Sequence, residues 1–178
     1  MSSMKWQSSS VTIFVIKVAV IFTIWYIIYE LWLLPDGQLD EWLSLNIIGN
    51  SAGILRWLDY NVITVNRVIA IEQYPGVEVV DGCNGVSSIG LFIGFIAAYP
   101  GDWRKKISFS ILGIALIYIA NIVRIAVLVL TEFLWPSFFI FAHDYATTAI
   151  FYFVIFILWM IWVNFNEKSF EKTSKSSG

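Results

Sequence analysis

Cysteine and histidine are almost missing from this sequence, which holds one of each among 178 residues. The lone cysteine, Cys83, excludes an internal disulfide framework and any metal site built from several cysteines. The lone histidine, His143, excludes the HExxH and paired-histidine metal motifs. P-loop and GxGxxG motifs are also absent from the sequence. We therefore expect no metal and no organic cofactor, and any chemistry must use very few groups.

Charge is scarce as well, because Asp, Glu, Lys and Arg make up 13% of the chain and the formal net charge is -2. Without a basic stripe carrying interleaved aromatic residues, a nucleic-acid partner is not expected. Apolar residues are abundant instead: they form 58% of the sequence, and the mean hydropathy is +0.75. That share exceeds what soluble domains carry and indicates an integral membrane protein in a lipid bilayer.

The apolar residues fall into four runs, and about 20 residues suffice for a helix to cross a bilayer. We predict an all-α integral membrane protein, a single domain over residues 1–178, built as a bundle of four transmembrane helices. The predicted spans are 11–34, 84–100, 107–131 and 144–163. The first is too long and too aromatic for a cleaved secretion signal. Residues 164–178 are predicted to form a polar tail.

The region between the first two spans, residues 35–82, is predicted to stay outside the membrane. Residues 39–58 carry apolar side chains at mostly helical spacing between charged ends, which favours an interfacial or re-entrant helix. Two β-branched runs, 62–71 and 77–81, flank the turn signal Tyr74-Pro75-Gly76. They predict a short β-hairpin just before Cys83.

The distribution of basic residues orients the four predicted spans, because cytoplasmic segments are rich in Lys and Arg. One side of the membrane would carry Lys5, Arg104, Lys105, Lys106, Lys168, Lys172 and Lys175. The other side would carry Arg56 and Arg67 among the carboxylates Asp36, Asp40, Glu41, Asp59, Glu72, Glu78 and Asp81. A fifth crossing at 39–58 would remove this asymmetry. Both termini are therefore predicted to face the cytoplasm, with residues 35–82 on the outer, periplasmic face of the cell inner membrane.

Cys83 is predicted to lie at the outer end of the second span, next to the N-terminus of a helix. The partial positive charge there favours thiolate over thiol. A lone cysteine is otherwise most often a small buried apolar residue. Ser87, Gly90 and Gly94 follow Cys83 on one face of this span, and Gly90-x-x-x-Gly94 permits close helix approach. We therefore expect the face that carries the thiol to be the packed face.

Arg124 lies seven residues before the outer end of the third predicted span, about 10 Å deep at 1.5 Å per residue. A charge in the hydrocarbon costs about 2.5–3.5 kcal/mol, so this side chain should face the bundle interior and have a partner. Asn121 shares its helical face. A structural ion pair with Glu30 or Asp144, or a side chain that snorkels to the headgroups, are the alternatives.

His143 opens the fourth predicted span at its outer end, so the only Cys, the only His and the deep Arg124 share one side of the membrane. An imidazole can take the proton of a neighbouring thiol, and the thiolate can then attack a carbonyl. Arg124 would stabilise the anion that develops. Without such neighbours, His143 would be an interfacial histidine with no catalytic task.

Three elements together resemble the exosortase/archaeosortase family over residues 77–160: Gly82-Cys83-Asn84-Gly85-Val86, Asn121-Ile-Val-Arg124-Ile125, and His143. The resemblance implies a polytopic, cysteine-dependent protease/transpeptidase. Its catalytic residues would be Cys83, Arg124 and His143, supported by Asn84, Gly85, Ser87 and Asn121. Asn84 stands where the family commonly has Ser, and the short chain is similar to the compact bacterial exosortases of variant F.

The resemblance also implies the substrate class: exported, membrane-anchored proteins whose C-terminal sorting signal comprises a short motif, a transmembrane helix and a basic cluster. Cleavage would occur at the outer face of the membrane and leave a thioester, which either water or an amine acceptor could resolve. Two other functions are compatible with the sequence. One is a non-catalytic scaffold subunit of an export or assembly complex, and the other is a thioester-using acyl or lipid transferase.

Overall fold

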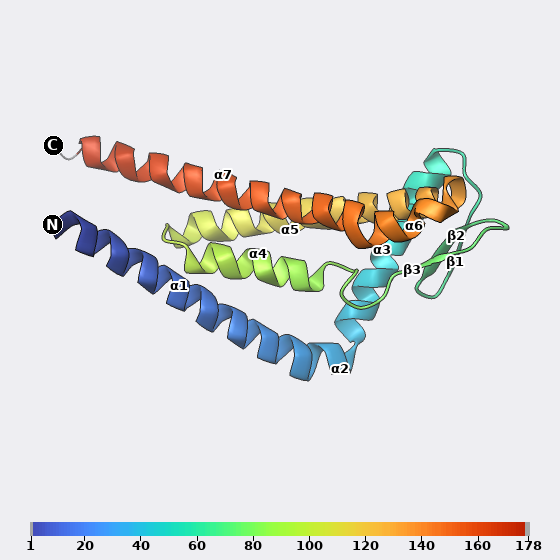
Figure 1. The fold of residues 1–178 in the computed structure, drawn as a ribbon, viewed down its shortest axis with the longest axis horizontal. Coiled ribbons are helices and arrows are strands. Elements are labelled where there is room, and N and C mark those ends of the chain that lie inside the picture. Colours follow the sequence, from blue (N-terminus) through green and yellow to red (C-terminus); the bar gives the residue numbers. More distant parts are fainter. Residues whose placement is uncertain (1, 177–178) are drawn as a thin grey trace.

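The computed structural model describes the backbone of residues 2–176 and the side chains of residues 12–166. Four helices run along its length: α1 (Ser2–Ile28), α4 (Val86–Ala98), α5 (Trp103–Leu134) and α7 (Thr147–Ser176). In Figure 1, α4 lies between α1 and the α5/α7 pair. The first turns of α1 and the last turns of α7 lie at one end of the bundle, and the non-spanning region lies at the other.

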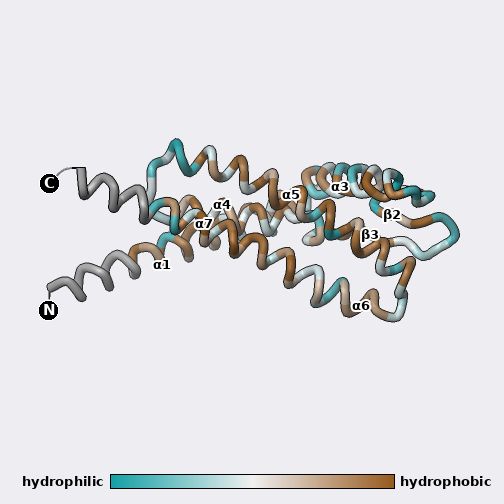
Figure 2. Tube along the Cα trace, turned by 90° about the horizontal axis from the view of Figure 1, so that it is seen from above, coloured by the Kyte–Doolittle hydropathy of each residue, from teal (hydrophilic) through white to brown (hydrophobic). Residues whose placement is uncertain are grey.

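Within residues 12–166, three helical segments are long and apolar enough to cross a membrane: Thr12–Asp36, Trp103–Leu134 and Pro136–Asn166. Figure 2 shows hydrophobic residues along most of their length. The second predicted span forms α4, which is apolar but has only 13 residues. Helix α7 continues past residue 163, where the last span was predicted to end and the polar tail to begin.

The first helix ends at a sharp break. A π-helical turn (Tyr29–Leu33) and the short α2 (Leu34–Asp36) extend α1, and Gly37 then adopts the left-handed conformation with φ 68°. This conformation costs glycine little because it has no Cβ. After the break, α3 (Gln38–Trp57) crosses the end of the bundle instead of running along it (Figure 1). Residues 39–58 are therefore helical up to Trp57, as predicted, and their interfacial or re-entrant placement stays a prediction.

The β-branched runs form a sheet of three antiparallel strands, β1 (Val62–Val65), β2 (Val68–Ile71) and β3 (Val77–Glu78), in the order β1-β2-β3. The predicted two-stranded hairpin is therefore incomplete. A turn at Asn66, with φ 51°, divides the first run into β1 and β2, whose register pairs Val65 with Val68.

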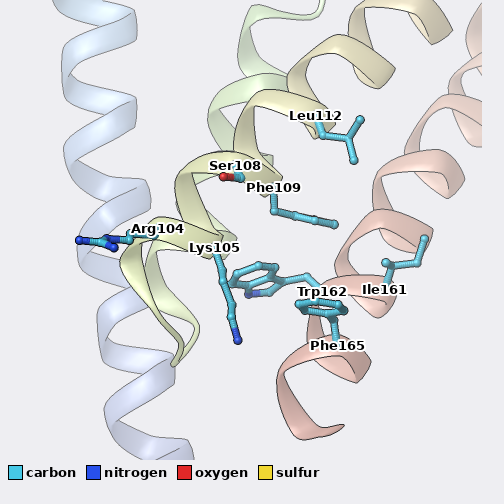
Figure 3. A pocket seen from close by; sticks show the side chains of 8 residues that line it. All are labelled: Arg104, Lys105, Ser108, Phe109, Leu112, Ile161, Trp162 and Phe165. Atoms are coloured by element: carbon cyan, nitrogen blue, oxygen red, sulfur yellow. The ribbon is translucent and has the colours of Figure 1, made fainter. Parts of the chain in front are cut away.

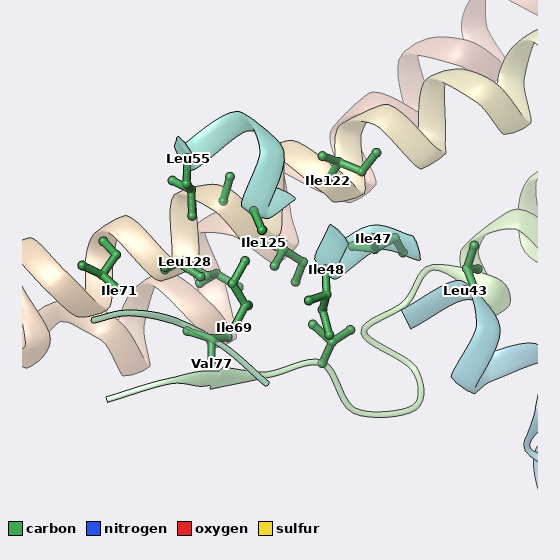
Figure 4. Close-up of a cluster of buried hydrophobic side chains, with 14 of the residues drawn as sticks. Leu43, Ile47, Ile48, Leu55, Ile69, Ile71, Val77, Ile122, Ile125 and Leu128 are labelled. Atoms are coloured by element: carbon green, nitrogen blue, oxygen red, sulfur yellow. The ribbon is translucent and has the colours of Figure 1, made fainter. Parts of the chain in front are cut away.

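A cluster of apolar side chains fixes the sheet and α3 against the second half of α5 (Figure 4). Ile47 and Leu55 of α3, Ile69 of β2 and Ile125 of α5 are buried there, at 1% exposure or less. A second cluster, centred on Phe92 and Trp162, joins α4, α5 and α7 further along the bundle. The first cluster therefore holds the segment before α4 in a fixed position relative to α5.

The glycine face of α4 packs against α1, as the sequence led us to expect. A Cβ at Gly90 would lie 2.1 Å from the Trp25 ring, and one at Gly94 would lie 2.7 Å from the Phe22 ring. Ser87, on the same face, lies beside the Tyr29 hydroxyl. The face of α4 that carries Ser87, Gly90 and Gly94 is thus in direct contact with the first helix.

Candidate active site

Cys83 lies in the turn that connects β3 to α4. Its backbone N–H donates to the carbonyl of Val80 at 3.0 Å. Gly82 and Gly85 in the same turn have positive φ values of 85° and 87°. Helix α4 begins at Val86, so the free, half-buried thiol precedes the positive end of a helix dipole by three residues.

Asn84 directly follows Cys83 and uses both ends of its buried amide. Its Oδ1 accepts a hydrogen bond from the N–H of Val86 at 3.1 Å, which caps the first turn of α4. Its Nδ2 donates to Oδ1 of Asp40 in α3. The same carboxyl oxygen accepts from the Tyr29 hydroxyl at 2.9 Å. The Cys83 turn is therefore tied to α3 and to the end of the first helix.

Asn121 ties the same turn to α5. Its Nδ2 donates to the backbone carbonyl of Cys83 at 3.0 Å, and the residue is 1% exposed. Gly85 lies against this amide, since a Cβ at residue 85 would be 3.3 Å from Nδ2 of Asn121. Among the residues described, Oδ1 of Asn121 is buried without a hydrogen-bond partner.

Arg124 lies almost one helical turn after Asn121 on α5. Its Nη2 is 3.4 Å from the hydroxyl of Thr148 in α7, and its guanidinium lies 5.6 Å from the centre of the Phe151 ring. A hydroxyl and an aromatic face are both favourable partners for a partly desolvated guanidinium. The Nε atom is buried and has no hydrogen-bond partner in the described part of the chain. A pocket of about 100 Å³ lies beside this side chain.

The ion pair considered for Arg124 is not formed. Asp144 pairs instead with His143, whose Nδ1 lies 2.8 Å from Oδ1 of Asp144. Neither of the two ion pairs found between the described residues involves Arg124 or Glu30. The partners of Arg124 are therefore Thr148 and Phe151, which its sequence environment did not indicate.

His143 lies in a π-helical turn, Ala142–Ala146, before α7. Its ring stacks on Phe139 with 5.8 Å between centroids, and its side chain is 35% exposed. The Thr148 hydroxyl donates to the backbone carbonyl of His143 at 3.0 Å. Wide helical turns of this kind often occur at functional sites.

Two polar side chains connect the predicted catalytic segments. Asn121 joins α5 to the Cys83 turn, and Thr148 contacts both Arg124 and the backbone of His143. Within the described residues, no hydrogen bond joins the thiol, the guanidinium and the imidazole directly. The start of α4 and the turn before α7 lie toward the end of the bundle where α3 crosses (Figure 1). The catalytic roles of the three residues stay predictions.

Asp40 and Tyr29 were not identified from the sequence as parts of this site. Asp40 is fully buried, although the charge pattern placed it with the acidic residues of the outer region. Its spacing offered a signal, because Leu43, Ser44 and Ile47 follow it at three, four and seven residues and are buried on the same face.

A second pocket, of about 410 Å³, lies between the start of α5 and the later turns of α7. Figure 3 shows Phe109, Trp162 and Phe165 gathered around it, with Lys105 beside them. Cys83 precedes α4, whereas this pocket lies near the residues that follow α4. It is therefore not part of the candidate active site.

The fold and this site define a mostly helical, multi-pass membrane protein whose single thiol lies at the start of a helix. The sequence matches the family model of the transmembrane exosortases (Exosortase_EpsH) over residues 6–160, and the chain belongs to that family. Exosortases act in membranes as transpeptidases or proteases in protein sorting. No curated protein and no solved structure matches the chain.

Proposed function

We propose that this protein is a membrane-embedded cysteine protease/transpeptidase. It cleaves the C-terminal sorting signal of exported, membrane-anchored proteins at the outer face of the cell inner membrane, with both termini in the cytoplasm. One observation carries the proposal: the lone cysteine of an exosortase family member is tied by Asn121 to the helical turn that contains Arg124. This contact supports a site in which the thiol and the partly buried guanidinium occupy neighbouring parts.

His143 serves as the general base in this proposal. Its Nδ1 is engaged by Asp144, so Nε2 is the nitrogen that accepts the thiol proton when Nδ1 carries the other hydrogen. The thiolate sulfur of Cys83 then bonds to the scissile carbonyl carbon, whose oxygen becomes an oxyanion. The imidazole and the thiol come within reach in the substrate complex, where catalytic hydrogen bonds commonly tighten.

Arg124 stabilises the oxyanion or orients the scissile peptide. Its guanidinium has five N–H donors in a planar fork. The fold uses one nitrogen for Thr148 and the π-face for Phe151, while the buried Nε–H has no partner among the described residues. This unused donor distinguishes Arg124 from an arginine whose donors are all engaged by the fold.

The tetrahedral intermediate collapses when His143 returns the proton to the departing amine, which leaves a thioester on Cys83. Water then releases a free carboxylate, or an amine acceptor takes the acyl group and forms a new amide. The substrate is anchored by its own helix and reaches the site by diffusion in the membrane plane. Its recognition motif, transmembrane helix and basic cluster are the elements that we expect the enzyme to distinguish.

Trapping the intermediate tests the proposal. We expect mass spectrometry of the full-length protein from its native membrane to find on Cys83 a peptide derived from a tailed exported protein. Cys83→Ala, Arg124→Ala and His143→Ala should each remain in the membrane and lose processing of that tailed protein. Normal processing by Cys83→Ala would refute the proposal. A lipid on Cys83 would indicate an acyl or lipid transferase.

The scaffold alternative gives a different set of results. A non-catalytic subunit would show Cys83 no more reactive toward a thiol-directed probe than a model thiol. Its Arg124→Ala variant would lose a protein complex rather than a covalent adduct. Measuring both the adduct and the complex in the same membranes separates these outcomes.

A further inference from the structure

Asp40 is a completely buried carboxyl group beside the Cys83 turn that the proposed mechanism does not use. It has 0% exposure. Burying a carboxyl group is costly unless it is hydrogen-bonded, so a buried acid at such a position needs an explanation. Its hydrogen bonds explain the burial, because one donor is Asn84, the residue that follows the proposed nucleophile Cys83.

Three separate elements meet at one oxygen of Asp40. The carboxyl group comes from the first turn of α3, immediately after the break at Gly37. Tyr29, from the π-helical turn, donates to Oδ1 at 2.9 Å, and Asn84, from the Cys83 turn, donates to the same atom. The second oxygen, Oδ2, is buried without a hydrogen-bond partner in the described residues.

The Asn84 side chain passes this contact on to the backbone around Cys83. Its Oδ1 accepts from the N–H of Val86 while its Nδ2 donates to Asp40. The contact with Asp40 therefore fixes the orientation of the amide that holds Val86. Asn121 holds the carbonyl of Cys83 itself. The turn is thus fixed at two consecutive residues by side chains of two different helices.

We propose that Asp40 is a positioning residue that orients the Cys83 turn through Asn84, with Tyr29 holding the carboxyl group in place. This inference rests on the proposed function, because it assumes that Cys83 is the nucleophile. Loss of the Asp40 carboxyl group removes the Oδ1 acceptor and leaves Asn84 with only the longer contact from its Nδ2 to the backbone carbonyl of residue 40, at 3.4 Å. Cys83 is then misplaced for attack while the substrate still binds. The chemical step should therefore slow without a matching change in KM.

Four variants of the full-length protein in membranes separate positioning from folding. Asp40→Leu keeps the approximate size and removes the acceptor, whereas Asp40→Asn keeps an oxygen for both donors. Asn84→Asp retains the cap on α4 but places an acceptor against an acceptor. The double variant Asp40→Asn/Asn84→Asp restores a donor–acceptor pair. The readouts are kcat and KM for the tailed protein recovered on Cys83, Cys83 labelling by iodoacetamide, and the midpoint of thermal unfolding.

We expect Asp40→Leu and Asn84→Asp to lose about tenfold or more in kcat, the effect of one lost hydrogen bond in the reacting geometry. Iodoacetamide should label Cys83 faster in both variants because the turn is loosened. Asp40→Asn and the double variant should return kcat to within about threefold of the wild type. A folded Asp40→Leu or Asn84→Asp with wild-type kcat overturns the inference. Equal loss in Asp40→Leu and Asp40→Asn, or a double variant no better than Asn84→Asp, overturns it as well.

Asn84→Asp and its rescue decide the question if Asp40→Leu does not fold. The inference and the proposed function fail in different ways. If the wild type forms no peptide adduct on Cys83, the proposed function fails. If the wild type forms the adduct and processes the tail, and the Asp40 and Asn84 variants match it, only the role of Asp40 is wrong.

Discussion

Nδ2 of Asn121 donates a hydrogen bond to the backbone carbonyl of Cys83 over 3.0 Å, which joins α5 to the turn that carries the only thiol. Because Asn121 is on the same face of α5 as Arg124, this bond also relates the Cys83 turn to the partly buried guanidinium. The amide of Asn121 thus adds a polar contact to the apolar cluster that holds the same segment against α5.

Asn121→Ala is expected to lower processing of the tailed substrate about tenfold or more, because a buried hydrogen bond of about 1–1.5 kcal/mol in the reacting geometry is lost. Processing in isolated membranes measures this. Asn166→Ala is the matched control, since Asn166 is also buried but, among the described residues, hydrogen-bonds only to the Trp162 carbonyl of its own helix. Equal processing by the two variants would show that the amide of Asn121 does not matter for the reaction.

Gly85 and Gly82 form a natural pair for testing the packing against Asn121. Both have similar positive φ, so alanine strains the backbone equally, by about 1–2 kcal/mol. Only at Gly85 would the new Cβ lie 3.3 Å from Nδ2 of Asn121, whereas at Gly82 nothing lies within 4 Å. Gly85→Ala should therefore lose much more activity than Gly82→Ala, at comparable thermal stability. Similar activities would contradict the proposed contact.

Arg124→Lys tests whether charge alone suffices. Lysine keeps the charge but lacks the planar fork that contacts Thr148 and stacks on Phe151, so we expect at least a tenfold loss of processing. Arg56→Lys is the control, because within the described part of the chain Arg56 hydrogen-bonds only to the carbonyl of Val62, at an exposed position. Wild-type processing by Arg124→Lys would leave Arg124 with a purely electrostatic role.

Asp144 is expected to orient His143. Asp144→Leu removes the acceptor 2.8 Å from Nδ1 and should reduce processing about tenfold or more, while Asp144→Asn keeps an oxygen there and should retain most of it. Substrate processing by both variants is the measurement. If the leucine variant is as active as the asparagine variant, the contact is only a surface pair.

The Gly90 contact predicts a stability effect in the first helix. A methyl group at residue 90 would lie 2.1 Å from the Trp25 ring, so Gly90→Ala should destabilise the protein by about 1–3 kcal/mol. Gly53→Ala places its methyl group in open space on α3 and should stabilise by comparison. Thermal unfolding in a mild detergent measures both. Adding Trp25→Leu to Gly90→Ala should recover part of the loss.

Hydropathy was sufficient to predict the three long helices, because twenty or more apolar residues have few alternatives to a membrane-spanning helix. Their ends were less certain. Helix α5 begins at Trp103, before the predicted start, because Asp102 accepts from the N–H of Arg104 and caps it. The predicted span excluded Arg104, Lys105 and Lys106, which belong to the first turn of α5. The β1–β2 turn was missed because one asparagine, Asn66, interrupts a uniform β-branched run.

The positions of Cys83, Arg124 and His143 along the chain could be predicted, but their partners could not. Thr148 and Phe151 contact Arg124 because of how α7 packs against α5, through a cluster that includes Phe151 together with Ile117 of α5. Asp40 is buried because the chain reverses at Gly37 and brings α3 back across the bundle. The periodicity of apolar residues predicts which face of a helix is buried, but not which other helix or strand packs against that face.

The shortness of α4 has a consequence for the depth of the reaction. At 1.5 Å per residue its 13 residues rise about 20 Å, roughly 10 Å less than the hydrocarbon thickness of an ordinary bilayer. In the proposed orientation, with the Ala98 end of α4 at the inner headgroups, the opposite end would stop within the outer leaflet, and the thiol would face a sunken, locally thinned patch of membrane. A tethered polypeptide would then have to dip into that depression to be cut, which predicts that lipid chain length affects turnover.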